Sequence, residues 1–132
     1  DGARDIDAVA PILRDRYPDI SIYTVRGNCD IGAFDLPVLE YFEVNGVRMI
    51  ATHGHAYNVK TGYESLLCEA ASKGAKVAFF GHTHKPLLEA ARGIYLVNPG
   101  AIAQHMAGNI AYAQVLVDSA GTIRADLMRW LC

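Results

Sequence analysis

The amino-acid sequence predicts an α/β fold, arranged as a layered sandwich, in a single domain that covers residues 1–132. Two observations support this prediction. Up to residue 85, apolar β-branched runs alternate with amphipathic helical segments, and after Pro86 only hairpin-like pairs of strands follow. Apolar residues make up 52% of the chain and charged residues 20%, a composition typical of a globular domain with a core.

The N-terminal segment predicts a helix followed by a buried strand. Over residues 5–16, apolar side chains recur at helical spacing, although Pro11 delays or bends the helix. Residues 20–25 (ISIYTV) are mostly apolar and β-branched, so they predict a short buried strand, which ends in the polar segment 26–30. The helical stripe consists of Ile6, Val9, Ile12 and Leu13.

Three pairs of apolar runs flank short turn signals and predict β-hairpins. The strongest signal is Asn45-Gly46, because an Asn-Gly pair favours the tight turn that matches the twist of two strands. Arg92-Gly93 and the segment 119–121 separate the other two pairs. The predicted pairs are 38–44 with 47–52, 87–91 with 94–98, and 110–118 with 122–130.

A second helix and another buried strand are predicted between the first two hairpins. Residues 62–73 carry apolar side chains at helical spacing, with Gly74 as the stop, and residues 76–80 (KVAFF) form an apolar run. The apolar side of this helix consists of Leu66, Leu67 and Ala70.

Charge and cysteine usage exclude several classes of protein. The net charge is −2 and the basic residues are scattered, which argues against extended binding to nucleic acid. Cys29, Cys68 and Cys132 are an odd number without a CxxC pair, so we expect a reducing, cytoplasmic setting. Neither a membrane-spanning run nor a signal peptide is evident, and we expect no membrane association.

Three segments repeat one pattern: an apolar run ends, a glycine lies nearby, and a side chain that can bind metal follows. They are 25–30 (VRGNCD), 51–55 (ATHGH) and 79–84 (FFGHTH). Strand ends at one edge of an α/β sheet converge on a crevice, and imidazole is a common metal ligand. A lone histidine is more often a surface or core residue, which is our interpretation of His105. The joint occurrence of the three segments favours a functional site.

These motifs resemble the later motifs of the calcineurin-like metallophosphoesterase superfamily, in particular the small phosphodiesterases of the YfcE type. The resemblance rests on Gly27-Asn28-Cys29-Asp30, His53-Gly54-His55, Gly81-His82-Thr83-His84 and the turn Asn98-Pro99-Gly100. It implies an α/β/β/α sandwich and a metal-dependent phosphodiesterase that acts on a small phosphodiester.

The resemblance also implies roles for single residues. Asn28, His53 and His82 would bind the second of two metal ions, His84 the first, and Asp1 would bridge both. Mixed nitrogen and oxygen ligands suit Mn, our first expectation, and also Ni, Zn, Fe or Co. Such a metal pair would polarise the phosphoryl group and activate a water molecule.

Three further residues are candidates for catalysis beside the ligand Asn28. Cys29 stands where many superfamily members have histidine, and a thiol is a weaker donor, so the resemblance favours diesters with good leaving groups. His55 would contact the phosphate or support a ligand. Asp30 would orient Cys29 or a metal-bound water, with a plain turn carboxylate as the alternative.

One family motif is missing, and this leaves alternatives open. The Asp-x-His motif of the first metal site is absent, so we expect the chain to be an N-terminally incomplete fragment whose first site keeps only Asp1 and His84. Apolar surface left uncovered would favour a homo-oligomer. The competing hypothesis is an inactive scaffold or protein-interaction module of the same fold, as in the retromer subunit that resembles this family. A structural single-metal site is a weaker third.

Overall fold

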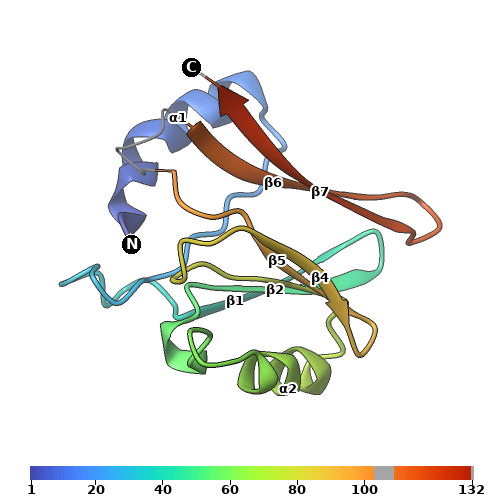
Figure 1. The fold of residues 1–132 in the computed structure, drawn as a ribbon. Helices are drawn as coiled ribbons and strands as arrows, with labels where there is room; N and C mark the ends of the chain where they lie inside the picture. Colours follow the sequence, from blue (N-terminus) through green and yellow to red (C-terminus); the bar gives the residue numbers. More distant parts are fainter. Residues whose placement is uncertain (103–108, 132) are drawn as a thin grey trace.

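The computed structural model describes residues 1–102 and 109–131, and it has two sheets and two α-helices (Figure 1). The larger sheet has five strands in the order β1-β2-β3-β5-β4, and the smaller sheet pairs β6 with β7. The strands are β1 (Leu39–Val44), β2 (Val47–Thr52), β3 (Val77–Phe79), β4 (Leu87–Ala91), β5 (Ile94–Asn98), β6 (Asn109–Val117) and β7 (Ile123–Leu131). The helices are α1 (Ile6–Arg16) and α2 (Glu64–Ser72), with short 3-10 turns at Ala3–Asp5 and His55–Tyr57.

The five-stranded sheet is mixed, and its three inner strands are parallel. β2, β3 and β5 run in the same direction, whereas β1 and β4 join them as antiparallel hairpin partners. Each hairpin turn has two residues with positive φ, 47° and 77° at Asn45 and Gly46 and 54° and 73° at Arg92 and Gly93. Such turns match the strand twist, and all three predicted hairpins are confirmed.

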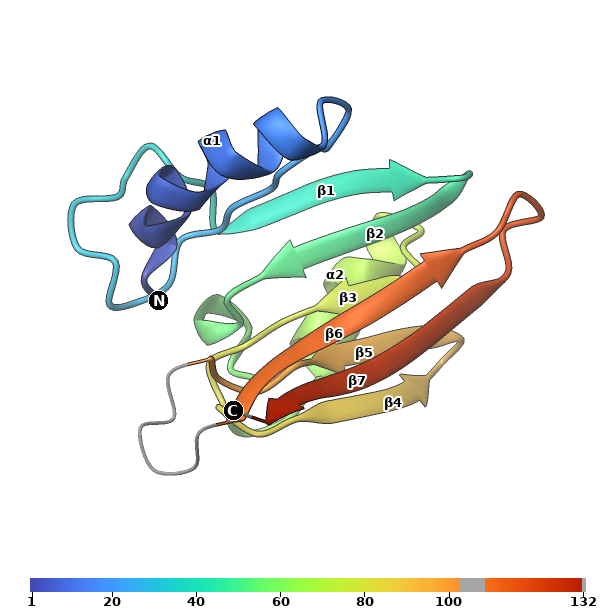
Figure 2. The same ribbon diagram turned by 90° about the horizontal axis from the view of Figure 1, so that it is seen from above.

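Successive side chains of the inner strands point to opposite faces of the sheet, and this divides the core into two layers. Ile50, Ala78 and Leu96 face α2, where they meet its buried residues Leu66 and Ala70. The opposite face packs against the β6–β7 hairpin, which crosses it in Figure 2. Its side chains include Met49, Val77 and Val97 from the larger sheet and Val115, Val117 and Leu127 from the hairpin. The predicted α/β fold with a central sheet is therefore confirmed, as is the second helix.

Residues 20–25 do not form the predicted strand. They run as an extended segment without a ladder of backbone hydrogen bonds, and Tyr23 stacks on Phe42 of β1 with ring centroids 4.6 Å apart. Ile20 and Tyr23 are also exposed rather than buried. The prediction was wrong because a strand requires a pairing partner, which this segment lacks among the described residues.

The first helix is confirmed, but its apolar stripe is largely uncovered. Val9 is 46% and Ile12 68% exposed, and Ala10 is the helical residue that is buried. Pro11 lies inside the helix without ending it. No helix in the described part of the chain is long and apolar enough to span a membrane.

Candidate metal centre

The edge formed by the C-terminal ends of β2 and β3 brings two histidine segments together. β2 ends at Thr52, directly before His53, and β3 leads through Phe80 to Gly81 and His82. The amide of Gly81 donates to the carbonyl of His53 (3.0 Å), which continues the parallel register beyond the last strand residues. The loops diverge only after this bond, so the two histidine side chains start from adjacent positions.

Three of the four histidines in these segments lie in contact. The ring centroids of His53 and His82 are 5.0 Å apart, those of His53 and His55 5.2 Å, and those of His55 and His82 6.2 Å. The Nδ1 atoms of His53 and His55 are 3.1 Å apart, so one ring donates a hydrogen bond to the other. His84 is exposed and does not belong to these ring pairs of the described residues. The structure therefore brings His53 and His82 together.

Asp1 reaches this edge from the other end of the chain. Its Oδ2 is 3.4 Å from Nε2 of His53, and its Oδ1 accepts a hydrogen bond from the amide of Cys29 (2.7 Å). Gly27 allows this approach, because a Cβ there would lie 2.1 Å from Oδ1 of Asp1. Asn28 and Cys29 are exposed, and the Asn28 amide donates to the Cys29 sulfur (3.3 Å).

Asp30 holds the Asp1 segment against the loop that contains Asn28. Its Oδ1 accepts hydrogen bonds from the amides of Gly2 (2.7 Å) and Ala3 (3.0 Å), and its Oδ2 from that of Gly27 (2.7 Å). Burial opposes ionisation, but the three amides prevail and lower the pKa of Asp30. Its described hydrogen bonds go to backbone amides rather than to Cys29, so in this structure Asp30 acts as a clamp between two loops.

The electrostatics of the edge favour neutral imidazoles. Burial lowers the pKa of His53 to about 4, with further lowering from His82 and His55. The pKa of His82 is also lowered, by burial and then by the positive charge of Lys60. A neutral imidazole keeps a lone pair on one nitrogen, which is the form that binds metal. At neutral pH the His53–Asp1 contact is therefore a contact between two potential ligands rather than a salt bridge.

The ligand set is not closed in this structure. Within residues 1–102 and 109–131, no three His, Cys, Asp or Glu side chains are grouped so as to hold one metal ion. The side chains meet in pairs, His53 with Asp1 and His53 with His82. His105 lies outside the described residues.

The sequence analysis did not assign a role to Asn98, the last residue of β5. Its side chain is fully buried and hydrogen-bonded to the loop that carries His82 and His84. A polar residue at the end of the apolar run IYLVN, on the strand next to β3, was the available signal.

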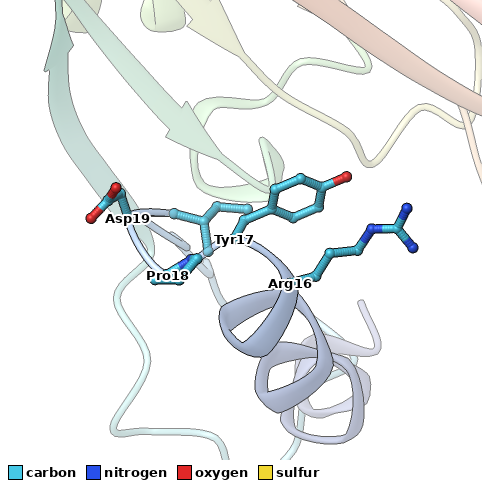
Figure 3. Close-up of a pocket in the computed structure, with 5 residues that line it drawn as sticks. Arg16, Tyr17, Pro18 and Asp19 are labelled. Atoms are coloured by element: carbon cyan, nitrogen blue, oxygen red, sulfur yellow. The ribbon is translucent and has the colours of Figure 1, made fainter.

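A cavity of about 530 Å³ lies elsewhere, beside the end of α1 (Figure 3). It is lined by the consecutive residues 16–20, and the side chains of Arg16 and Tyr17 extend together from the helix end while Asp19 points away from them. It contains none of the predicted site residues. The potential metal ligands meet instead at the histidine edge.

The sequence model of the calcineurin-like phosphoesterase superfamily domain matches residues 4–120, which include all three motif segments. The chain belongs to this superfamily. A probable metallophosphoesterase of Bacillus subtilis, YsnB, is 35% identical over 92 residues, which are 68% of this chain and 53% of that protein. The chain spans about half the length of the curated relatives that it matches, 53%, 50% and 46% of the first three.

Solved structures share the fold of this superfamily member. A predicted phosphoesterase from Streptococcus pneumoniae superposes with a TM-score of 0.70 at 23% identity and covers 93% of this chain and 90% of its own. Vps29 from Entamoeba histolytica, solved with Zn²⁺, gives 0.68 at 18% identity, with coverage of 92% and 75%. An archaeal phosphodiesterase gives 0.61 at 18%, with coverage of 92% and 79%.

Proposed function

We propose that this chain contributes the histidine-bearing part of a metal-dependent phosphodiesterase, in which two metal ions activate water for attack on phosphorus. The observation that supports it best is that His53, held neutral by burial, contacts both Asp1 and His82 at one sheet edge. Membership of the phosphoesterase superfamily and the fold shared with an archaeal phosphodiesterase agree with it.

The residues at this edge fit a divalent transition metal. Two ligand atoms that bind one ion at about 2.1 Å with a tetrahedral angle are themselves about 3.4 Å apart. Nε2 of His53 and Oδ2 of Asp1 have this separation, 3.4 Å. His82 and Asn28 would complete the second site, and Asp1 with His84 would belong to the first. When bound, the metal ions would lower the pKa of water and neutralise charge on the phosphoryl oxygens. Mn is our first choice for such mixed ligands.

The remaining residues would position ligands and limit the substrate. The hydrogen bond to His55 fixes the ring orientation of His53, as partners of metal-bound imidazoles commonly do. Asp30 fixes the Asp1 segment through backbone amides. The exposed thiol of Cys29 is a weak proton donor, which favours small phosphodiesters with good leaving groups over monoesters.

We also propose a cytoplasmic setting and self-association for this chain. Cys29 and Cys68 are exposed and free, which suits a reducing compartment. Ile31 is 95% and Phe34 81% exposed beside the Asn28 loop, and Ile12 on α1 is 68% exposed. Apolar side chains in such positions favour contacts with a second copy.

A protein-interaction scaffold of the same fold is the second candidate function. Vps29 structures are among the fold neighbours, and the ligand side chains of the described residues meet only in pairs. A scaffold with a residual metal site would bind metal without turnover, whereas an enzyme would show both.

The deciding experiment measures metal binding and turnover on one sample. This chain alone lacks Asp-x-His and is expected to turn over slowly or not at all, so we would use a form extended at the N-terminus by a segment that bears this motif. We would titrate Mn²⁺ by calorimetry and follow hydrolysis of bis(p-nitrophenyl) phosphate for the extended form and for its His82→Ala and His105→Ala variants. We expect His82→Ala to lower the rate by about 10²-fold or more, because it removes a metal ligand, while the histidine control keeps it. Equal losses in both variants contradict the ligand assignment. Metal binding without turnover in the extended form supports the scaffold.

A further inference from the structure

The loop that carries His82 and His84 has an unusual backbone. Both residues are non-glycine residues in the left-handed region, with φ of 65° and 57°. The amide of Thr83 donates to the carbonyl of Gly81 (2.7 Å), which closes a three-residue turn around His82. Turns of this kind with positive φ at the centre are rare and strained. Left-handed non-glycine residues are strained and persist only where surrounding contacts impose them.

The side chain of Asn98 contacts both residues that flank His82. Its Nδ2 donates to the carbonyl of Gly81 (3.1 Å) and to Oγ1 of Thr83 (2.9 Å). These two residues flank His82, and Thr83 lies between the two histidines. The Thr83 hydroxyl extends the network, because it accepts from the amide of Lys85 (3.2 Å) on the far side of His84. The side chain of Asn98 thus holds both ends of the His82 turn.

The Asn98 side chain is itself held rigidly. It ends β5 and is fully buried, and its Oδ1 accepts a hydrogen bond from the amide of Gly100 (2.9 Å). Gly100 has a φ of 95°, and a Cβ there would lie 3.2 Å from Cγ of Pro86, so the turn after β5 packs closely on the end of the histidine loop. A buried amide with both its donors and its acceptor engaged has one low-energy orientation.

We propose that Asn98 is a positioning residue, which fixes the left-handed backbone of His82 and His84 and thereby preorganises their side chains for a metal ion. The part of this proposal that concerns metal rests on the proposed function, whereas the part that concerns the backbone does not. An ordinary buried asparagine would stabilise the fold without influencing one loop selectively. The bonds to Gly81 and Thr83 assign its effect to the histidine loop.

The test uses Asn98→Asp, which keeps the shape and the acceptor but removes both donors. Thr83→Val removes the hydroxyl partner at nearly constant shape, and Thr83→Ser keeps it. We expect Asn98→Asp to weaken Mn²⁺ binding by about 10- to 100-fold, the range seen when partners of metal ligands are lost. Thr83→Val should weaken Mn²⁺ binding less, and Thr83→Ser, which keeps the hydroxyl, should bind Mn²⁺ normally. The double variant Asn98→Asp with Thr83→Val should resemble Asn98→Asp alone, because both substitutions remove the same Asn98–Thr83 hydrogen bond.

Two further measurements separate this role from a general loss of stability. Urea unfolding shows whether each variant is folded under the assay conditions, and backbone chemical shifts report on His82 and His84 directly. We expect shifts at these residues in metal-free Asn98→Asp, with the signals of α2 unchanged. Unchanged His82 and His84 signals, or full Mn²⁺ affinity in a folded Asn98→Asp variant, overturn the proposal. If the unmodified chain binds no Mn²⁺, the proposed function fails, and the chemical shifts still decide the positioning role.

Discussion

Replacing Gly27 with alanine tests the placement of Asp1 without altering a predicted ligand. A Cβ on Gly27 would lie 2.1 Å from Oδ1, 2.7 Å from the nitrogen and 2.9 Å from Cγ of Asp1. Non-bonded carbon atoms and their neighbours are normally about 3.5 Å apart, so Asp1 must move by roughly 1 Å or more. Ligand distances in metal sites vary by only about 0.2 Å, and a displaced Asp1 could not share an ion with His53.

The expected loss can be expressed as an affinity. Displacement of one ligand with the others in place should weaken Mn²⁺ binding by about 10- to 100-fold, which corresponds to about 1.4–2.7 kcal/mol. The variant also loses the hydrogen bond from the amide of Cys29 to Asp1, so its free energy of unfolding should fall by about 1 kcal/mol. Calorimetric titration with Mn²⁺ and urea unfolding measure the two effects separately.

Gly62→Ala is the matched control for this substitution. A Cβ on Gly62 would meet no atom within 4 Å, and its φ does not lie in the left-handed region. We expect this variant to bind Mn²⁺ normally and to gain up to about 1 kcal/mol in stability through the unfolded state. If Gly27→Ala is folded and binds Mn²⁺ as tightly as Gly62→Ala, Asp1 is not a ligand and the reasoning from the close approach is refuted.

Three other substitutions test the site, the core and the pH dependence. Cys29→His should leave Mn²⁺ binding intact and raise the rate ratio of p-nitrophenyl phosphate to its bis ester, because imidazole can protonate a poor leaving group; loss of metal would instead identify Cys29 as a ligand. Leu66→Ala should lower the free energy of unfolding by about 2–5 kcal/mol, since Leu66 is fully buried; a smaller change in urea unfolding would place it outside the core. The amides of Thr122 and Ala120 lower the pKa of Asp118, although desolvation opposes them, so its stabilisation is complete above 3.8 and is lost as pH falls through the folded value. Asp118→Asn should therefore be less stable than the unmodified protein at pH 7 and approach it below pH ~3; a constant difference over this range would contradict the assignment.

Local signals in the sequence were sufficient to predict most elements. Asn45-Gly46 determines a turn within two residues, and the two strands beside it need no distant information to pair. The spacing of Leu66 and Ala70 likewise identifies the face of α2 that is buried. Residues 20–25 are β-branched and apolar like the residues of a buried strand. Whether a strand forms there depends on a partner segment, which no local pattern reveals.

The sequence indicated only part of the arrangement at the histidine edge. His53 and His82 follow apolar runs, and the expectation that strand ends meet at one edge of a sheet agrees with their contact. The sequence analysis allowed Asp30 to be a turn carboxylate, and its bond from the Gly27 amide fits that alternative. The bonds of Asp30 to the amides of Gly2 and Ala3, and that of Asn98 to the Gly81 carbonyl, could not be predicted, because these partners are backbone groups remote in the sequence. When a side chain binds backbone groups, its partner can be any residue type, so the sequence contains no pair of matching side chains that would reveal the contact.

The sheet brings the backbones of the two ligand candidates close but does not by itself align their side chains. His53 is in register with Gly81, so His82 lies one residue further along, and on a regular strand its side chain would point to the opposite face. The bond from the amide of Gly81 to the carbonyl of His53 keeps the strand spacing up to the residue before His82. The ring centroids of His53 and His82 are 5.0 Å apart. At this distance, suitable rotation of the two rings can direct one nitrogen of each toward a common point. The parallel pair β2–β3 thus brings the two backbone segments together, and the left-handed turn at His82, which we attribute to Asn98, determines the direction of the second ring.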